Sequence, residues 1–220
     1  MILQNNPTKG GPMRPICFVI ATVLIASSLT AAAWKVYPQR ELGFLVEFPG
    51  DPSESTGRYH TGLVQSATAH IFSLKDDQAL YVATVVDLLD RKEEGATLLG
   101  EAESSLTMLG DVASISISRV TPGANAVYGQ FITIDCRSGR VVGQRGAADT
   151  ARTWFKDITG AECPDRSRLV ANVFFTRGRL YLIQGINLPG AEDTLSPSAM
   201  RFANSLSFLG AGARRGGPPQ

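Results

Sequence analysis

The segment LVANVFFTRGRLYLIQGI, Leu169–Ile186, carries the strongest fold signal in the chain. Two runs rich in β-branched and aromatic residues flank Arg177-Gly178, and a two-residue turn containing glycine is the usual connection of a tight β-hairpin. The glycine supplies the positive φ that such a turn needs. We therefore predict a hairpin of strands 169–176 and 179–186, and we expect the remaining strands to extend it.

Other segments repeat the strand signal. Phe44, Val46 and Phe48 alternate along 43–48, which is typical of a strand with one buried face. The run 79–88 is almost continuously apolar and predicts a central strand covered on both faces. Further strands are indicated at 63–74, 112–120 and 126–135. Together the segments predict a sheet of about six or seven strands.

Two segments have helical periodicity instead. Between Glu93 and Leu109 the apolar residues recur on one helical face, and Gly110 follows as an expected left-handed helix end. A second helix is expected to begin at the cap Ser196, with Pro197 in its first position. Its apolar face would consist of Met200, Ala203, Leu206 and Leu209. We predict an α+β domain, a twisted antiparallel sheet packed by two main helices.

The N-terminus has the organisation of a secretory signal. Lys9 and Arg14 precede an apolar run of 11 residues, 16–26, which a polar stretch connects to three alanines. Ala31 and Ala33 place small side chains at the −3 and −1 positions of a cleavage site before Trp34. This pattern predicts a signal peptide at 1–33 and a periplasmic or secreted domain at 34–209.

Two alternatives remain open at this end. An apolar run of 11 residues is shorter than the ~20 that a spanning helix needs, yet the segment is also compatible with an uncleaved anchor. Translation starts at either Met1 or Met13, because the first 12 residues add little signal character. After processing we expect no stable membrane span.

Charge argues against a dedicated nucleic-acid binder. Removal of 1–33 takes away two of the 21 basic residues and none of the 20 acidic ones, which leaves 19 against 20 and a net charge of −1. Residues 34–111 have a net charge of −7 and residues 112–220 one of +6. The folded protein is therefore either an electrostatic dipole or a surface of mixed charge, depending on whether the halves interleave.

Two cysteines remain after Cys17 leaves with the signal peptide. In an oxidising compartment Cys136 and Cys163 are expected to form a disulfide. The alternative, a reactive thiol, needs a nearby base, and His60 and His70 are both far away in the sequence.

The cysteines lie near the ends of a 33-residue insertion, 136–168, which is far longer than a hairpin loop. A short helix is expected at 147–155, and long loops often carry function. We predict a contact surface here, consisting of Arg145, Arg152, Trp154, Phe155 and Lys156. Equally, the two aromatic residues can be a plug that packs the insertion onto the domain. The segment 210–220 is expected to be a disordered tail.

Three stretches give the chain a family outline: GFLVEFPGDP at 43–52, GRLYLIQG at 178–185 and MRFANSLSF at 200–208. Together they resemble the PsbP/Mog1-like superfamily over residues 43–209. The resemblance implies a compact α+β domain with an accessory or partner-binding role rather than an enzymatic one. The insertion at 136–168 departs from the family pattern, and no functional residue of a relative matches a position here.

We predict no catalytic residue, metal site or cofactor. His60 and His70 lack the spacing of a zinc-binding pair, and Asp76-Asp77 is better interpreted as turn chemistry than as a calcium site. Basic residues gather in the second half, at Arg137, Arg140, Arg145, Arg152, Lys156, Arg166, Arg168, Arg177 and Arg179. They either converge on an anionic ligand or form a dispersed surface with Asp149, Asp157, Glu162 and Asp165.

The functional expectation follows from these observations. We expect an exported, non-enzymatic protein that binds another envelope component through its insertion. A domain that binds a small anionic ligand through the arginine-rich half is the alternative, and an enzyme is the third possibility.

Overall fold

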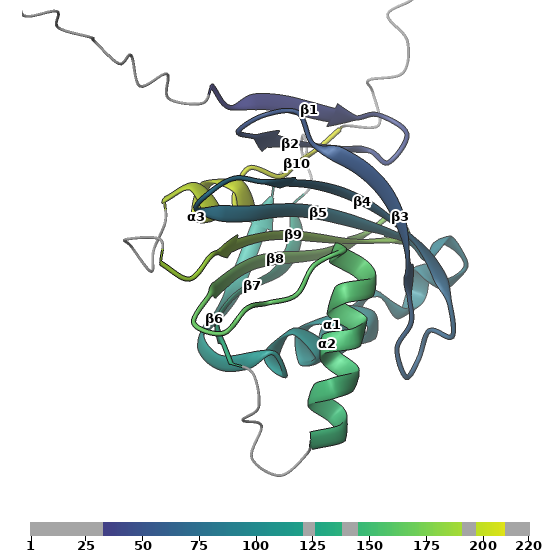
Figure 1. Cartoon of the computed structure of the whole chain (residues 1–220). Coiled ribbons are helices and arrows are strands. Elements are labelled where there is room, and N and C mark those ends of the chain that lie inside the picture. The colour runs from purple at the N-terminus through teal and green to yellow at the C-terminus, as the bar shows by residue number, and fades with distance from the viewer. Residues whose placement is uncertain (1–32, 121–125, 138–144, 191–196, 210–220) are drawn as a thin grey trace, which may run out of the picture. The chain divides into compact units, whose positions relative to one another are not determined.

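The computed structural model describes residues 33–120, 126–137, 145–190 and 197–209, with side chains of the helix at 145–159 from Asp149 onward (Figure 1). Seven strands form one antiparallel sheet in the order β3-β4-β5-β9-β8-β7-β6. They are β3 (Ser53–Tyr59), β4 (Ala67–Lys75), β5 (Ala79–Asp87), β6 (Gly110–Val120), β7 (Val127–Cys136), β8 (Arg168–Thr176) and β9 (Arg179–Asn187).

A second, three-stranded antiparallel sheet has the order β1-β2-β10. Its strands are β1 (Lys35–Gln39), β2 (Phe44–Phe48) and β10 (Ser207–Phe208). The helices are the 3-10 helix η1 (Leu89–Glu94), α1 (Gly95–Thr107), α2 (Arg145–Thr159) and α3 (Pro197–Ala203). The predicted α+β class and the large antiparallel sheet are confirmed, whereas the small sheet and α2 at its full length were not expected.

The large sheet is covered on both faces, and β9 explains how. Successive side chains of a strand point to opposite faces. Leu180 and Leu182 therefore enter one core, which also contains buried residues of α1 and α2. Tyr181 and Ile183 enter the other core, together with side chains of α3 and the small sheet. As predicted from its continuous apolar sequence, β5 is buried along almost its whole length.

The hairpin of β8 and β9 has the turn that the sequence predicts. Arg177 and Gly178 both have positive φ, 55° and 73°, as a type I′ turn requires. The carbonyl of Gly178 accepts a hydrogen bond from the Leu88 N–H at 2.8 Å. The turn thereby fixes the end of β5 beside the hairpin.

One helix end differs from the prediction. Gly110 is not a left-handed helix end, because α1 ends at Thr107 and Gly110 is the first residue of β6. A Cβ at position 110 would lie 2.1 Å from the carbonyl oxygen of Asp135. The glycine is therefore required by the close approach of β6 to β7.

The last helix is shorter than expected. It begins at Pro197 as predicted but ends at Ala203, and Ser207–Phe208 then pairs with β2 as β10. The expected apolar face is only partly correct: Ala203 and Leu206 are buried, whereas Met200 and Leu209 are only partly buried. Because the chain leaves the helix after Ala203, Phe208 rather than Leu209 packs in the second core. The expected cap Ser196 and the tail at 210–220 lie outside the described residues.

Candidate functional site

The insertion is closed by the predicted disulfide. Cys136 at the end of β7 is bonded to Cys163, which follows α2, and their Cα atoms are 5.9 Å apart. Backbone hydrogen bonds reinforce the closure, because the Cys136 N–H donates to Ser167 and its carbonyl accepts from Arg166. Both ends of the long excursion are therefore attached to one strand of the sheet.

One face of the helix α2 packs the insertion against the core. Ala151, Trp154, Phe155 and Ile158 fall on one side of the helix and are buried. Trp154 is 2% exposed and Phe155 1% exposed, so the prediction that they belong to an exposed contact surface is wrong. Their role is the alternative one, a plug: the Trp154 ring meets the edge of Tyr59 at 6.0 Å between ring centroids.

Two of the remaining predicted contact residues, Arg152 and Lys156, lie away from the buried face of α2. Arg152 donates a hydrogen bond to the carbonyl of Arg137 at 2.9 Å, and Lys156 pairs with Glu162 at 3.1 Å. The side chain of Arg145 lies outside the described part of α2. The structure thus keeps Arg152 and Lys156 together on the solvent side and removes the aromatic pair from them.

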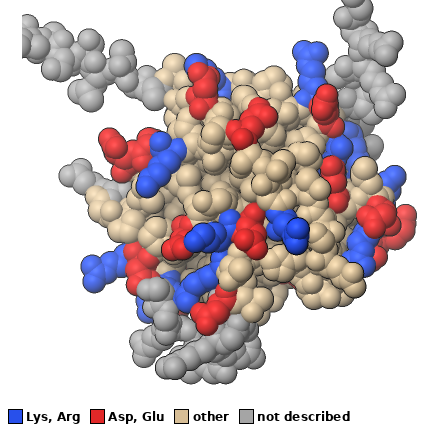
Figure 2. Space-filling view, turned by 45° about the vertical axis from the view of Figure 1, so that its right-hand side comes forward, with Lys and Arg blue, Asp and Glu red and all other residues tan. Residues whose placement is uncertain are grey.

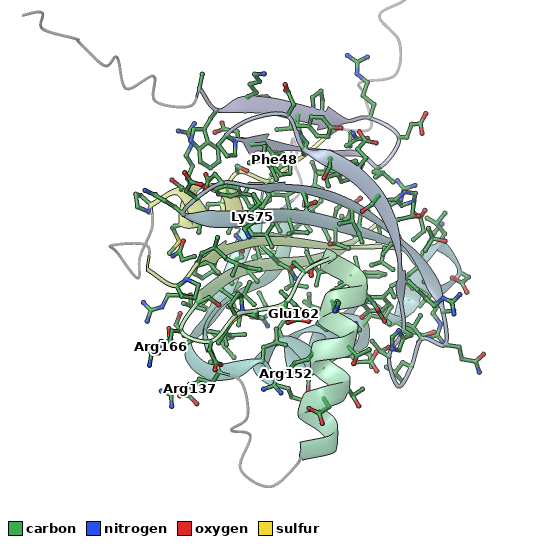
Figure 3. All side chains as sticks on the ribbon, in the orientation of Figure 1. Phe48, Lys75, Arg137, Arg152, Glu162 and Arg166 are labelled. Carbon is green, nitrogen blue, oxygen red and sulfur yellow. A yellow bond between two sulfur atoms is a disulfide. The ribbon has the colours of Figure 1, made fainter. Side chains whose placement is uncertain are left out.

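A hollow of about 480 Å³ opens beside this face of α2. Eight of its nine lining residues belong to the insertion: Arg152, Thr153, Phe155, Lys156, Glu162, Cys163, Pro164 and Asp165, with Leu109 as the ninth. Leu109 and Phe155 are buried and form an apolar floor. The charged side chains of both signs stand at the rim, and Figure 3 shows Arg152 and Glu162 beside α2.

Sequence reasoning did not place Thr153, Glu162 or Leu109 at this site. A signal for Thr153 exists, because a helix through 145–159 puts positions 149, 152, 153 and 156 on the face opposite the buried one. Glu162 had been assigned only to the acidic residues that dilute the basic charge. No periodicity in the sequence brings Leu109, at the end of the α1 segment, to the insertion.

A second hollow, of about 570 Å³, lies on the other side of α2 and includes His60, Glu101 and Trp154 in its lining. The Glu101 carboxylate accepts hydrogen bonds from the Thr61 hydroxyl at 2.5 Å and from the Leu63 N–H at 3.0 Å. These bonds hold the loop between β3 and β4, which is a structural use of the carboxylate. We assign no chemistry to this hollow.

Most of the basic side chains that the structure describes in the second half are paired with separate carboxylates. Arg168 pairs with Asp135 at 2.7 Å, and this hydrogen bond raises the pKa of Arg168. Other pairs are Arg137–Asp111, Arg152–Asp149, Lys156–Glu162 and Arg179–Asp87. Arg140 lies outside the described residues. This arrangement matches the dispersed surface and counts against a concentrated anion site.

The acidic and basic halves of the chain interleave. Arg179 pairs with Asp87, Arg137 with Asp111 and Arg201 with Glu47, so each pair joins one half to the other. In Figure 2 basic and acidic side chains alternate across the visible face. Of the two outcomes predicted from the charge distribution, the mixed surface is the one observed.

The histidines are separate from each other. His60 lies 3.8 Å from Asp157, and His70 lies 3.4 Å from Asp87. In the described segments no three histidine, cysteine, aspartate or glutamate residues gather as metal ligands would. Asp76 is turn chemistry as predicted, because its Oδ1 accepts hydrogen bonds from the N–H groups of Gln78 and Ala79.

Comparisons with known proteins add no assignment. No family model matches the chain, and no curated protein matches it either. The resemblance to the PsbP/Mog1-like superfamily therefore remains a prediction. Among the helices that the structure describes, none has the length and apolar character needed to cross a bilayer.

Proposed function

We propose that the protein is exported to the periplasm or secreted, and that it is a non-enzymatic binding protein whose insertion receives a polypeptide partner from the cell envelope. The observation that carries this proposal is the hollow beside α2, which insertion residues line almost completely. Binding therefore belongs to the part of the chain that departs from the family outline.

The chemistry of the hollow favours a polypeptide over a small anion. Specific protein interfaces combine an apolar centre with a polar rim. Here Leu109 and Phe155 supply the apolar floor, while Lys156 and Glu162 supply opposite charges at the rim. An apolar side chain of a partner, flanked by charges of both signs, fits this combination, whereas a phosphate group would meet the carboxylates of the rim.

The hollow is also held in place before any partner arrives. The disulfide joins the two ends of the insertion, and the buried Trp154 ring packs α2 against the core. A surface that loses little freedom on binding keeps more of its interaction energy as affinity. The disulfide and the buried aromatic residue therefore support a binding role without taking part in the contact.

The packing of Trp34 is compatible with export. Trp34, the first residue after the proposed cleavage site, packs against Tyr81 with 5.7 Å between ring centroids. The Arg201 guanidinium lies 4.4 Å from the centre of the Trp34 ring. Cleavage before Trp34 would thus leave this packed residue as the new N-terminus. A disulfide between Cys136 and Cys163 agrees with an oxidising compartment.

Site-directed photo-crosslinking in the producing cells tests this proposal. A photoreactive amino acid in place of Thr153 lies at the hollow, while the same residue in place of Thr150 lies one turn earlier on α2 and lines the other hollow. We expect a discrete protein adduct from position 153 that weakens when Glu162→Lys reverses a rim charge, and a much weaker adduct from position 150. Equal labelling from both positions, or no adduct from position 153, would refute the proposal.

A further inference from the structure

The two edges of the seven-stranded sheet differ in how they are protected. Exposed edge strands invite pairing with other chains, and proteins usually blunt them with charges, prolines or short length. The edge strand β3 carries Glu54 and Arg58 and extends over seven residues. The opposite edge, β6, extends over eleven residues and has no charged residue and no proline between Asp111 and Arg119.

The exposed apolar side chains of β6 lie on one face of the sheet. Directly paired residues of antiparallel strands point to the same side, and Val112 pairs with Ile134 while Ile115 pairs with Ile132. Both isoleucines of β7 are buried in the core that contains α1. Val112 and Ile115 are three residues apart, and the register shift between Val112 and Ser114 brings them to the same face.

The exposed apolar residues of this face form a stripe along β6 and the neighbouring end of β7. Val112, Ile115 and Ile117 are 45%, 44% and 76% exposed, and Tyr128 on β7 is 60% exposed. The other face of β6 carries three small hydroxyl residues, Ser114, Ser116 and Ser118. Among the described strands only β7 pairs with β6, so its outer backbone groups face away from the sheet.

We propose that β6 pairs antiparallel with β6 of a second copy of this chain, with the two-fold axis near Ile115, so that the two large sheets become continuous. A symmetric pairing about the middle of the strand places its apolar centre against the same centre of the other copy.

The charges at the two ends of β6 favour a second copy of this chain as the partner strand. Asp111 lies near the start of β6 and Arg119 near its end, so antiparallel pairing sets the acidic end of each strand beside the basic end of the other. The Asp111 carboxylate is paired with Arg137 in its own chain and remains 54% exposed, and Arg119 stacks over Tyr128 at 5.8 Å. Both charges are therefore held at the ends of the stripe, where they favour this register and oppose a parallel one.

Sedimentation velocity of the protein, purified as the cells process it, tests this pairing. Over about a hundred-fold range of concentration we expect a monomer–dimer equilibrium. Ile117→Lys introduces the charge that protected edges carry, at a side chain outside the core. We expect it to give a monomer whose melting temperature equals that of the wild type at concentrations low enough for the wild type to be monomeric. Val36→Lys is the matched control, since Val36 is an exposed aliphatic residue on β1 and its substitution should leave the dimer intact.

Cross-linking locates the two-fold axis independently. In the proposed pairing, position 115 of one copy lies opposite position 115 of the other. A short thiol-specific cross-linker should therefore join the Ile115→Cys variant into covalent dimers, whereas the Val36→Cys variant should remain uncross-linked. A monomer at every concentration would overturn the proposal. A dimer that survives Ile117→Lys, or one that Ile115→Cys does not trap, would overturn it equally.

Discussion

The disulfide should contribute a large share of the stability of the domain, and opening it provides a quantitative test. Cys136 and Cys163 are separated by 27 positions. In the loop-entropy description a cross-link over this separation destabilises the unfolded chain by about 3.5 kcal/mol. Reduction of the wild-type protein removes the constraint and keeps both sulfur atoms, so it should lower the free energy of unfolding by about this amount.

The double variant Cys136→Ala/Cys163→Ala should be slightly less stable than the reduced wild type. Cys136 is buried in the core, and deletion of its sulfur leaves a small void that costs about 1 kcal/mol more. Urea unfolding followed by tryptophan fluorescence measures the stability of the oxidised wild type, the reduced wild type and the double variant under the same conditions. A loss below about 1 kcal/mol on reduction would refute the claim that this bond restrains the insertion.

Three further predictions concern side-chain packing on the two faces of the large sheet. Trp154→Ala should lower the free energy of unfolding, measured by chemical denaturation, by about 3–5 kcal/mol because the ring is buried in the core. Thr153→Ala on the exposed face should change the same free energy by less than about 0.5 kcal/mol. Equal losses in the two variants would contradict the burial of Trp154. Gly185→Ala should lower the free energy of unfolding by about 1–3 kcal/mol, because the new Cβ would lie 2.5 Å from the carbonyl oxygen of Ala199. As a control, Gly100→Ala on α1 has open space around the new Cβ and should stabilise the protein by about 0.5–1 kcal/mol. A Gly185→Ala melting temperature at or above that of the wild type would be inconsistent with the close packing of α3 on β9. Burial raises the pKa of Tyr59 well above its ordinary value of 10.0, so the folded state retains a proton that the unfolded state loses, and stability should be intact below pH 10 and fall as the pH rises further. Urea midpoints at about pH 9 and about pH 11 measure this fall, which Tyr59→Phe should reduce. An equal fall in the variant would contradict the role of Tyr59.

Local sequence patterns correctly predicted those features whose structure depends on only a few nearby residues. The turn at Arg177-Gly178 needs only positive φ at two residues. The disulfide was predicted because the expected signal peptide leaves only two cysteines to pair. Phe44, Val46 and Phe48 are buried in alternation as their spacing predicts. These features depend on residues that lie close together or have few possible partners.

Features that depend on distant partners were missed. The strand β3 is polar and mostly exposed, so its conformation depends on pairing with β4 rather than on its own sequence. Phe208 lies in a strand instead of a helix because β2 offers it a pairing edge. The burial of Trp154 depends on the full length of α2, and the short helix expected at 147–155 left its orientation open. The hollow required both α2 and Leu109, which no sequence pattern joins.

One measurement tests the central claim that a processed, disulfide-closed body presents the insertion outside the cytoplasm. Intact-mass analysis with N-terminal sequencing and a thiol count, on protein recovered from fractionated cells, reports processing and oxidation together. We predict an N-terminus at Trp34, an envelope or extracellular location and no free thiol at Cys136 or Cys163. A cytosolic chain that begins at Met1 or Met13, with both thiols reduced, would contradict the account.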